Sequence, residues 1–187
     1  YNHKDPITKT YAQIREELQY CLSLGSRFVD FEGGEPMLWR DGDYDINSLC
    51  DLAHELGFFS CTITTNAQKD FSGCRADSIW VSMDGVGKYH ESIRGEGTFG
   101  RLEHNIAACG HPAVSVNMAI NTLNADGVAE AIEYAKQSPY IQKISLNFHT
   151  PFPGSEALAL DWQRRGEVID LILEYKKKGY PIMNSAT

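Results

Sequence analysis

Closely spaced cysteines are the first feature that the sequence lacks. Its five cysteines are Cys21, Cys50, Cys61, Cys74 and Cys109. No two of them have the spacing of roughly two to four residues typical of a zinc or iron–sulfur loop. An odd number of scattered cysteines is typical of free, mostly buried thiols in a reducing compartment. We therefore expect a cytoplasmic protein in which none of these cysteines binds a metal.

Excess positive charge and long hydrophobic runs are also missing. The 187 residues include 17 Lys and Arg against 25 Asp and Glu, a net charge of −8. Sequence-independent nucleic-acid binding needs a basic face, so a nucleic-acid partner is not expected. No apolar run reaches the ~18–20 residues of a membrane span. The polar start Tyr1–Asp5 is unlike a signal peptide, so we expect a globular protein without a membrane span.

The apolar residues that are present switch several times between the helical period and the strand period. They predict helices over 11–24, 46–57, 98–110, from 126 and from 161, and strands over 27–31, 59–64, 79–83, 114–120 and 143–148. Thr10 with Gln13 forms a capping-box pattern, and Thr98 is expected to cap a later helix. Strands that alternate with helices predict an α/β fold with parallel strands and right-handed crossovers. Periodicity alone does not separate a barrel from an open, doubly wound sheet.

Polar or glycine-rich clusters stand at the ends of all five predicted strands. They are Gly33–Glu35, Thr65 with Asn66, Ser82 with Asp84, Asn117–Asn121, and Asn147 with His149. Parallel α/β folds bind ligands at the carboxyl edge of the sheet. Five clusters at this one edge predict a ligand site there.

Two of these clusters suggest particular ligand groups. Gly33 and Gly34 let a ligand approach the backbone, and the acceptor-only carboxylate of Glu35 suits an ammonium group. A glycine turn with an exposed glutamate is the alternative. Ser82 and Asp84 share a strand face by the period-2 rule and suit sugar hydroxyls, although a strand-ending turn gives the same pattern.

Arg101 lies in the first turn of a predicted helix, where the helix dipole does not favour a cation. A carboxylate partner would explain an arginine at this position, and an unpaired surface arginine is the alternative. His90 and Arg94 stand four residues apart in a glycine-rich loop, which favours a local structural pair.

Three further polar residues stand near the ends of the predicted strands. His149, between Phe148 and Pro151, suits either core packing or a substrate contact. Asp30 and Glu32 alternate with an apolar residue near the interior, so we expect one of them to be buried and paired.

Three segments resemble one known family. FEGGEP (residues 31–36) resembles the GGEP motif of radical S-adenosylmethionine (radical SAM) enzymes, VSMDG (81–85) resembles their fourth strand, and residues 90–101 are similar to the segment that follows it. The three occur in family order across nearly the whole chain. The sequences of these motifs are most similar to those of the branch that includes peptide-modifying maturases and cofactor-biosynthesis enzymes.

The resemblance implies a fold and a set of binding residues. The fold is a partial (β/α)6 barrel, with the five strands as its second to sixth and residues 1–187 as a single domain. The implied SAM-binding residues are Gly33, Gly34, Glu35 and Pro36 around the methionine ammonium, Ser82 and Asp84 near the ribose and carboxylate, Arg101 at the carboxylate, and Thr65, Asn66 and Asn117 along the pocket. Glu32, where the family often has threonine or another small residue, and His149 are candidate substrate contacts.

The implied chemistry is reductive cleavage of SAM by a [4Fe–4S] cluster to give a 5′-deoxyadenosyl radical that abstracts a substrate hydrogen. The expected partners are a peptide or small-molecule substrate and a reductant such as flavodoxin or ferredoxin.

One departure from the family is large. Its Cys-x3-Cys-x2-Cys cluster loop and the first barrel strand are absent, and the chain begins, near Tyr1–His3, about where the family sequence continues after that loop. A fragment of a longer enzyme and a cluster-free member are the two explanations. We favour the fragment, because a barrel without its first strand exposes an unpaired edge, and we expect the fragment alone to be inactive.

Two other functions fit part of the pattern. A (β/α) barrel lyase or hydrolase would use Glu35 and Asp84 as acid and base. A cluster-free relative would bind SAM or a partner as a scaffold.

Overall fold

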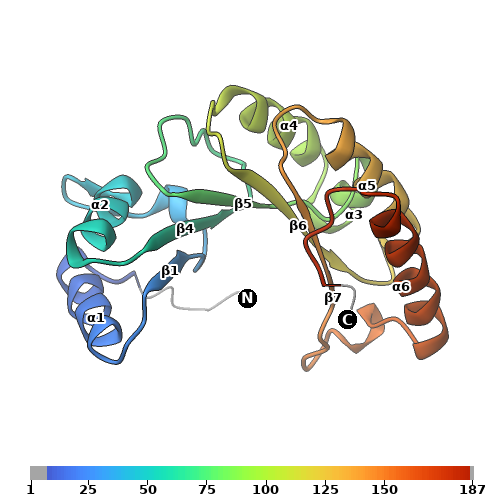
Figure 1. Ribbon diagram of the computed structural model, residues 1–187, viewed down its shortest axis with the longest axis horizontal. Helices are drawn as coiled ribbons and strands as arrows, with labels where there is room; N and C mark the ends of the chain where they lie inside the picture. Colours follow the sequence, from blue (N-terminus) through green and yellow to red (C-terminus); the bar gives the residue numbers. More distant parts are fainter. Residues whose placement is uncertain (1–7, 186–187) are drawn as a thin grey trace.

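A curved sheet of five parallel strands organises residues 8–185, the part of the chain that the computed structural model describes (Figure 1). The strands lie in the order β1 (Phe28–Phe31), β4 (Ser60–Thr65), β5 (Ser78–Ser82), β6 (Val114–Ile120) and β7 (Ile144–Phe148), each parallel to its neighbours. Spatial order follows chain order, so every crossover advances in the same direction. This is the winding of a barrel and not of a doubly wound sheet.

Six helices accompany the sheet in the described residues, and Figure 1 shows them along the outside of the arch that it forms. They are α1 (Tyr11–Ser23), α2 (Ile46–Leu56), α3 (Lys88–Arg94), α4 (Thr98–Ala108), α5 (Val128–Gln137) and α6 (Trp162–Lys177). The short elements are the 3-10 turns η1 (Pro36–Leu38), η2 (Ala125–Gly127) and η3 (Glu156–Leu158) and the hairpin of β2 (Arg40–Asp41) and β3 (Tyr44–Asp45). None of the described helices is long and apolar enough to cross a membrane.

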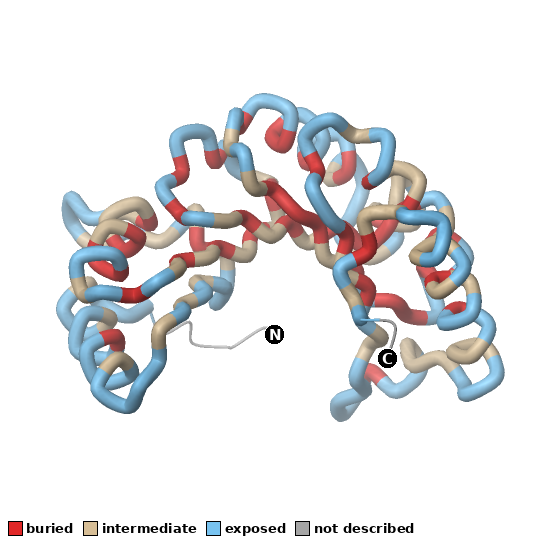
Figure 2. The backbone as a smooth tube through the Cα atoms, viewed as in Figure 1, coloured by how far each residue is buried: buried red, intermediate tan, exposed pale blue. Residues whose placement is uncertain are grey.

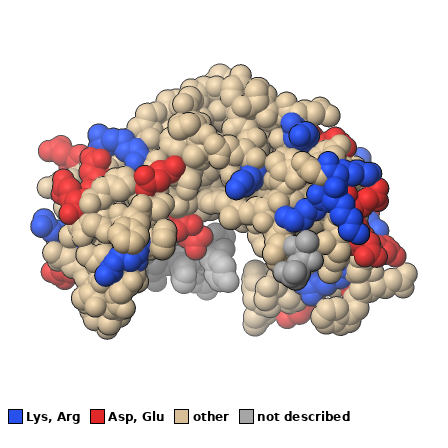
Figure 3. Space-filling model, viewed as in Figure 1, with Lys and Arg blue, Asp and Glu red and all other residues tan. Residues whose placement is uncertain are grey.

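Burial alternates along the strands and separates the two faces of the sheet. In β4, Cys61 and Ile63 are fully buried, whereas Thr62 and Thr64 between and beyond them are only half-buried. The buried residues belong to the hydrophobic core shared with helix residues such as Leu49 of α2. The alternate positions therefore face the concave side of the arch, which no described helix covers (Figure 2). On the face seen in Figure 3, charged side chains gather at the two ends of the arch, and the middle of the arch carries few of them.

The predicted N-terminal cap is confirmed at α1 and wrong at α4. The N–H of Gln13 donates to Thr10 Oγ1 at 3.2 Å, and the N–H of Thr10 donates to Gln13 Oε1 at 2.9 Å, which completes the predicted capping box. At α4, Gly97 is the capping residue, and Thr98 is already helical. Its hydroxyl donates to the carbonyl of Gly95 at 2.6 Å, so it is not available to cap the helix.

Helix α3 and the β2–β3 hairpin are not predicted by the sequence pattern. His90 and Arg94 lie in α3 and not in a loop, because glycines at positions 87 and 95 bound a helix of only seven residues. Of the cysteines, four are buried as expected, whereas Cys21 is exposed and does not join the apolar stripe of α1. Tyr1–His3, where the family resemblance locates the end of a cluster loop, lie outside the described residues.

Candidate functional site

The turn after β1 exposes its backbone at the carboxyl edge of the sheet. Gly33 and Gly34 are both exposed, and a Cβ built on either would meet no atom within 4 Å. Gly34 has a φ of +62°, a conformation that side-chain-bearing residues rarely adopt. The turn therefore leaves open space beside its carbonyl and N–H groups.

Glu35 fastens this turn to the end of β4. Its carboxylate accepts hydrogen bonds from Thr65 Oγ1 at 2.6 Å, from the N–H of Asn66 at 2.8 Å and from the N–H of Met37 at 3.2 Å. Pro36, which is buried, starts η1, where its fixed φ and missing N–H cost nothing. The predicted cluster of Glu35, Pro36, Thr65 and Asn66 is thus brought together, and Glu35 is held by other residues of the chain.

Asp84 fastens the end of β5 to the end of β6 in the same way. It is 3% exposed, and its Oδ2 accepts from Arg94 Nε at 2.6 Å while its Oδ1 accepts from the N–H of Ala119 at 3.1 Å. Strand β5 ends at Ser82, so Asp84 lies beyond the strand and the expected shared strand face does not apply. Both carboxylate oxygens are engaged within the protein, an arrangement that suits a positioning residue better than an acid or base.

His90 and Arg94 form the local structural pair that their spacing predicts, with Asp84 at its centre. His90 is fully buried, and its Nδ1 accepts from the N–H of Asp84 at 3.1 Å. The proton of the neutral ring therefore lies on Nε2, which has no hydrogen-bond partner among the described residues. Burial lowers the pKa of His90, and the nearby Arg94 charge adds to this effect.

Arg101 lies in the first turn of α4. It is exposed, and it forms no hydrogen bond or ion pair with another residue of the described chain. The carboxylate partner that its position predicts is therefore not among residues 8–185. Its guanidinium keeps all of its donors available for an anion.

Ser82 and Asn117 are neighbours on the concave face, where they stand opposite each other in the register of β5 and β6. Both are half-buried. Each therefore keeps part of its surface open to the concave side.

Asp30 and Glu32 are both exposed, so the prediction that one of them is buried and paired is wrong. Among the described strands β1 pairs only with β4, and Asp30 keeps one side open to solvent. Thr64 Oγ1 donates to Asp30 at 3.2 Å. Partial desolvation raises the pKa of Asp30 and the Glu32 charge adds to it, against the opposing effect of the Thr64 hydrogen bond.

His149 packs within its own loop. Its Nε2 lies 3.0 Å from Ser155 Oγ, and its ring meets Phe152 edge-on with centroids 5.8 Å apart. Of its two predicted uses, local packing is the one that these contacts serve.

The described residues do not fit an iron–sulfur cluster. No group of three or more His, Cys, Asp or Glu side chains within residues 8–185 is arranged to hold a metal ion. Four of the five cysteines are buried. The donor set for a cluster is therefore absent from the described chain.

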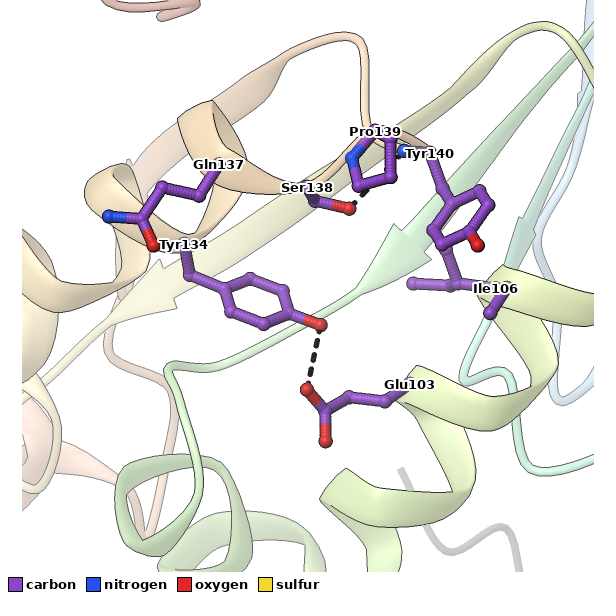
Figure 4. A pocket seen from close by; sticks show the side chains of 8 residues that line it. Glu103, Ile106, Tyr134, Gln137, Ser138, Pro139 and Tyr140 are labelled. Atoms are coloured by element: carbon purple, nitrogen blue, oxygen red, sulfur yellow. Dashed lines mark hydrogen bonds between the residues drawn. The ribbon is translucent and has the colours of Figure 1, made fainter.

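A pocket of about 320 Å³ lies elsewhere, between α4 and α5 (Figure 4). Tyr134 Oη donates to Glu103 at 3.0 Å across it, and burial together with this carboxylate raises the pKa of Tyr134. None of its lining residues comes from the strand ends, so it is separate from the site described above.

Most residues of the concave face are absent from the predicted site. Trp80 stands on it between Thr64 and Ser115 in the strand register, and none of these three residues was predicted to be functional. The signal was present in the alternation of Thr62 and Thr64 with buried neighbours, which period-2 counting detects.

Known proteins share this architecture. No protein-family model matches the chain. A probable GTP 3′,8-cyclase from Methanocella arvoryzae is 25% identical over 169 residues, which are 86% of this chain and 55% of the relative. Native anSMEcpe with bound AdoMet superposes with a TM-score of 0.68 in its complex with the Kp18Cys peptide and 0.70 with the Cp18Cys peptide, in each case at 16% identity. These superpositions cover 94% and 95% of this chain and 55% and 56% of the solved chains.

These likenesses extend over most of the chain and agree with the resemblance to radical SAM enzymes that its motifs indicate. Its five parallel strands match the partial barrel of these radical SAM structures, as the sequence motifs predicted. The chain spans about half the length of the relatives that it matches.

Proposed function

We propose that this chain is the SAM-binding core of a radical SAM enzyme whose cluster ligands lie outside the 187 residues. The observation that carries the proposal is the exposed Gly33–Gly34 turn at the carboxyl edge of the sheet, fixed to β4 by Glu35. The turn has open space beside its backbone, and hydrogen bonds of Glu35 hold it in place. Such a turn suits a ligand that is recognised through the backbone.

Each part of a bound SAM would have a counterpart among the residues predicted for this site. The Gly33 and Gly34 carbonyls would accept from the methionine ammonium, with Glu35 holding the turn in position. Arg101 would pair with the carboxylate, because it forms no hydrogen bond or ion pair with another residue of segment 8–185. Ser82, Asn117, Thr65 and Asn66 would line the remainder of the pocket, and Asp84 and Pro36 would hold its walls.

SAM held by these residues beside a [4Fe–4S] cluster would supply radical chemistry that removes hydrogen from a substrate. A peptide or small-molecule substrate and a reductant such as flavodoxin or ferredoxin complete the proposal. Glu32, exposed next to the glycine turn, is proposed to face the substrate, and His149 to shape the loop beside it.

Arg101→Ala tests the cofactor assignment. The substitution should raise the dissociation constant of SAM about tenfold, because a charge-assisted pair is lost. The melting temperature should change little, since Arg101 has no hydrogen bond or ion pair to lose within the described part of the chain. Arg15→Ala is the matched control, because Arg15 is an equally exposed helical arginine on α1. Isothermal titration that gives equal affinities for the two variants would contradict the assignment.

A second experiment tests the chemistry. The longest native chain that contains this segment would be reconstituted anaerobically with iron and sulfide, and dithionite-driven release of 5′-deoxyadenosine would be followed by chromatography. We expect release. Its absence from a native chain without a cysteine loop would support the second candidate, a cluster-free SAM-binding relative, with which the lack of a metal-ligand group within residues 8–185 is compatible.

A further inference from the structure

The pocket between α4 and α5, two of the helices on the outside of the arch, combines a carboxylate with two tyrosine rings. Its volume is about 320 Å³. Figure 4 shows Tyr134 and Tyr140 on opposite sides of the pocket, with the Glu103 carboxylate below them. In the described part of the chain, no lysine or arginine lines this pocket. Its one charged group is therefore negative and has no positive neighbour among the lining residues.

Contacts within the chain fix the walls of the pocket. Tyr134 Oη donates to Glu103 at 3.0 Å, and the Tyr134 ring meets Phe99 edge-on with centroids 5.6 Å apart. The N–H of Tyr140 donates to Ser138 Oγ at 3.3 Å, which holds the turn that carries the Tyr140 ring. Both rings and the carboxylate are thus positioned before a ligand binds, which lowers the entropy cost of binding.

Glu103 keeps acceptor capacity for a ligand. One of its carboxylate oxygens accepts from Tyr134, and the other accepts from no residue of segment 8–185. The Tyr134 hydroxyl gives its proton to Glu103, so its own oxygen also remains an acceptor. Two oxygens with unused acceptor positions suit a ligand that brings hydrogen-bond donors. The negative charge of Glu103 disfavours an anion.

We propose that this pocket binds the guanidinium group of an arginine side chain presented by a protein partner. A planar guanidinium stacks on a tyrosine ring while its N–H groups donate to a carboxylate, and a lysine ammonium does not stack in this way.

Two observations favour a side chain of a protein over a free small molecule. Tyr140 is 50% exposed, so the pocket covers only the end of a ligand, whereas small-molecule sites enclose most of theirs. The net charge of −8 also attracts a basic protein surface over a long range.

Peptides that differ in one group test the ligand. An N-acetylated, C-amidated glycine–arginine–glycine peptide, its citrulline and lysine analogues, and methylguanidinium would be titrated into the full native chain at constant ionic strength. The ¹³C-methyl signals of Ile106 and Ala107, which line the pocket, report binding there. Citrulline keeps the shape of arginine and loses its charge. We expect saturable millimolar binding of the arginine peptide, binding of the citrulline peptide at least about tenfold weaker, and weaker binding of the lysine peptide and of methylguanidinium.

Variants then locate the binding groups. Glu103→Gln keeps an acceptor for Tyr134 and loses the charge, so it should weaken the arginine peptide at least about tenfold. Tyr140→Leu keeps an apolar wall without an aromatic ring and should weaken it about threefold. Glu55→Gln, at an exposed position of α2, changes the net charge by the same amount and should not change the affinity. Thermal melting confirms that each variant folds.

Each outcome decides for or against the inference. Equal affinities of the arginine and citrulline peptides, or an affinity that Glu103→Gln leaves unchanged, would overturn it. An equal loss in Glu103→Gln and Glu55→Gln would also overturn it, because net charge alone would then explain the binding. Methylguanidinium that binds as tightly as the arginine peptide would identify a small-molecule site and overturn the protein partner. None of these measurements uses SAM, so their outcome and that of the proposed function are independent.

Discussion

At the residue scale, burial decides how much a carboxylate contributes to the free energy of unfolding. Asp84 is 3% exposed, and both of its oxygens accept hydrogen bonds, one of them from Arg94. We expect Asp84→Asn to lower the free energy of unfolding by about 2–3 kcal/mol, because Arg94 then loses its charged partner in a mostly buried site. Urea unfolding followed by circular dichroism measures the change.

An exposed pair gives the comparison for Asp84. Asp126 pairs with Arg164, and its side chain is 77% exposed. Exposed pairs contribute little, so Asp126→Asn should leave the melting temperature almost unchanged. A loss as large as that of Asp84→Asn would show that burial does not set the contribution of these pairs.

His90 makes stability depend on pH. Burial lowers its pKa in the folded protein, whereas the unfolded chain protonates near ~6.5. The unfolded state therefore binds the proton first as pH falls, and the free energy of unfolding should decrease below pH ~6.5 by up to about 1.4 kcal/mol per pH unit. His90→Asn, which keeps an acceptor for the Asp84 N–H, should remove this slope. Parallel curves for the two proteins between pH 7 and 5 would contradict the assignment.

At the element scale, the long elements could be predicted and the short ones could not. The strand over 114–120 shows its alternation in sequence and matches β6 residue for residue. The seven-residue α3 could not be predicted, because its glycine boundaries look like a loop and its stability comes from contacts with other elements. The cap of α4 was misassigned for a similar reason, since a threonine before a helix and a threonine inside its first turn give the same local sequence.

Helix α3 is fixed by a tyrosine that fits against two glycines. A Cβ at Gly127 would lie 2.5 Å from the ring of Tyr89, and a Cβ at Gly85 would lie 2.6 Å from Tyr89 Cβ. We expect Gly127→Ala to destabilise the protein by about 1–3 kcal/mol through overpacking, and Tyr89→Leu to relieve part of that cost in the double variant.

Gly100 in α4 is the matched control for Gly127. A Cβ there meets nothing within 4 Å, and its φ is not positive. Gly100→Ala should therefore stabilise the protein by about 0.5–1 kcal/mol. Thermal unfolding of the two alanine variants should shift in opposite directions, and a common direction would argue against the Tyr89 contact.

At the scale of the whole molecule, the sequence predicted which residues share one edge of the sheet but not the contacts among them. Parallel strands bring their carboxyl ends to one edge, so five polar clusters in sequence predicted one site in space. That Glu35 would be held by Thr65 depends on which strands become neighbours, and this is a property of the assembled sheet. The same holds for Asp84 and Arg94, because the helix that carries Arg94 was not predicted.

The sheet should also differ in stability from one side to the other. Strands β4, β5 and β6 each have two strand neighbours, whereas β1 pairs only with β4 among the described residues. Phe28 in β1 is 72% exposed, and Ile79 and Val81 in β5 are fully buried. Local opening needs less free energy where fewer contacts break, so the amides of β1 should exchange with deuterium at least about tenfold faster than those of β5.

Hydrogen exchange with mass spectrometry at two protein concentrations tests whether β1 exchanges faster than β5. It also shows whether the open edge of β1 pairs with another chain. Protection of β1 that rises with concentration would mean that the open edge pairs with a second chain, as exposed edge strands tend to do. Equal protection of β1 and β5 at low concentration would show that the sheet opens as one unit, and would contradict a gradient set by strand neighbours.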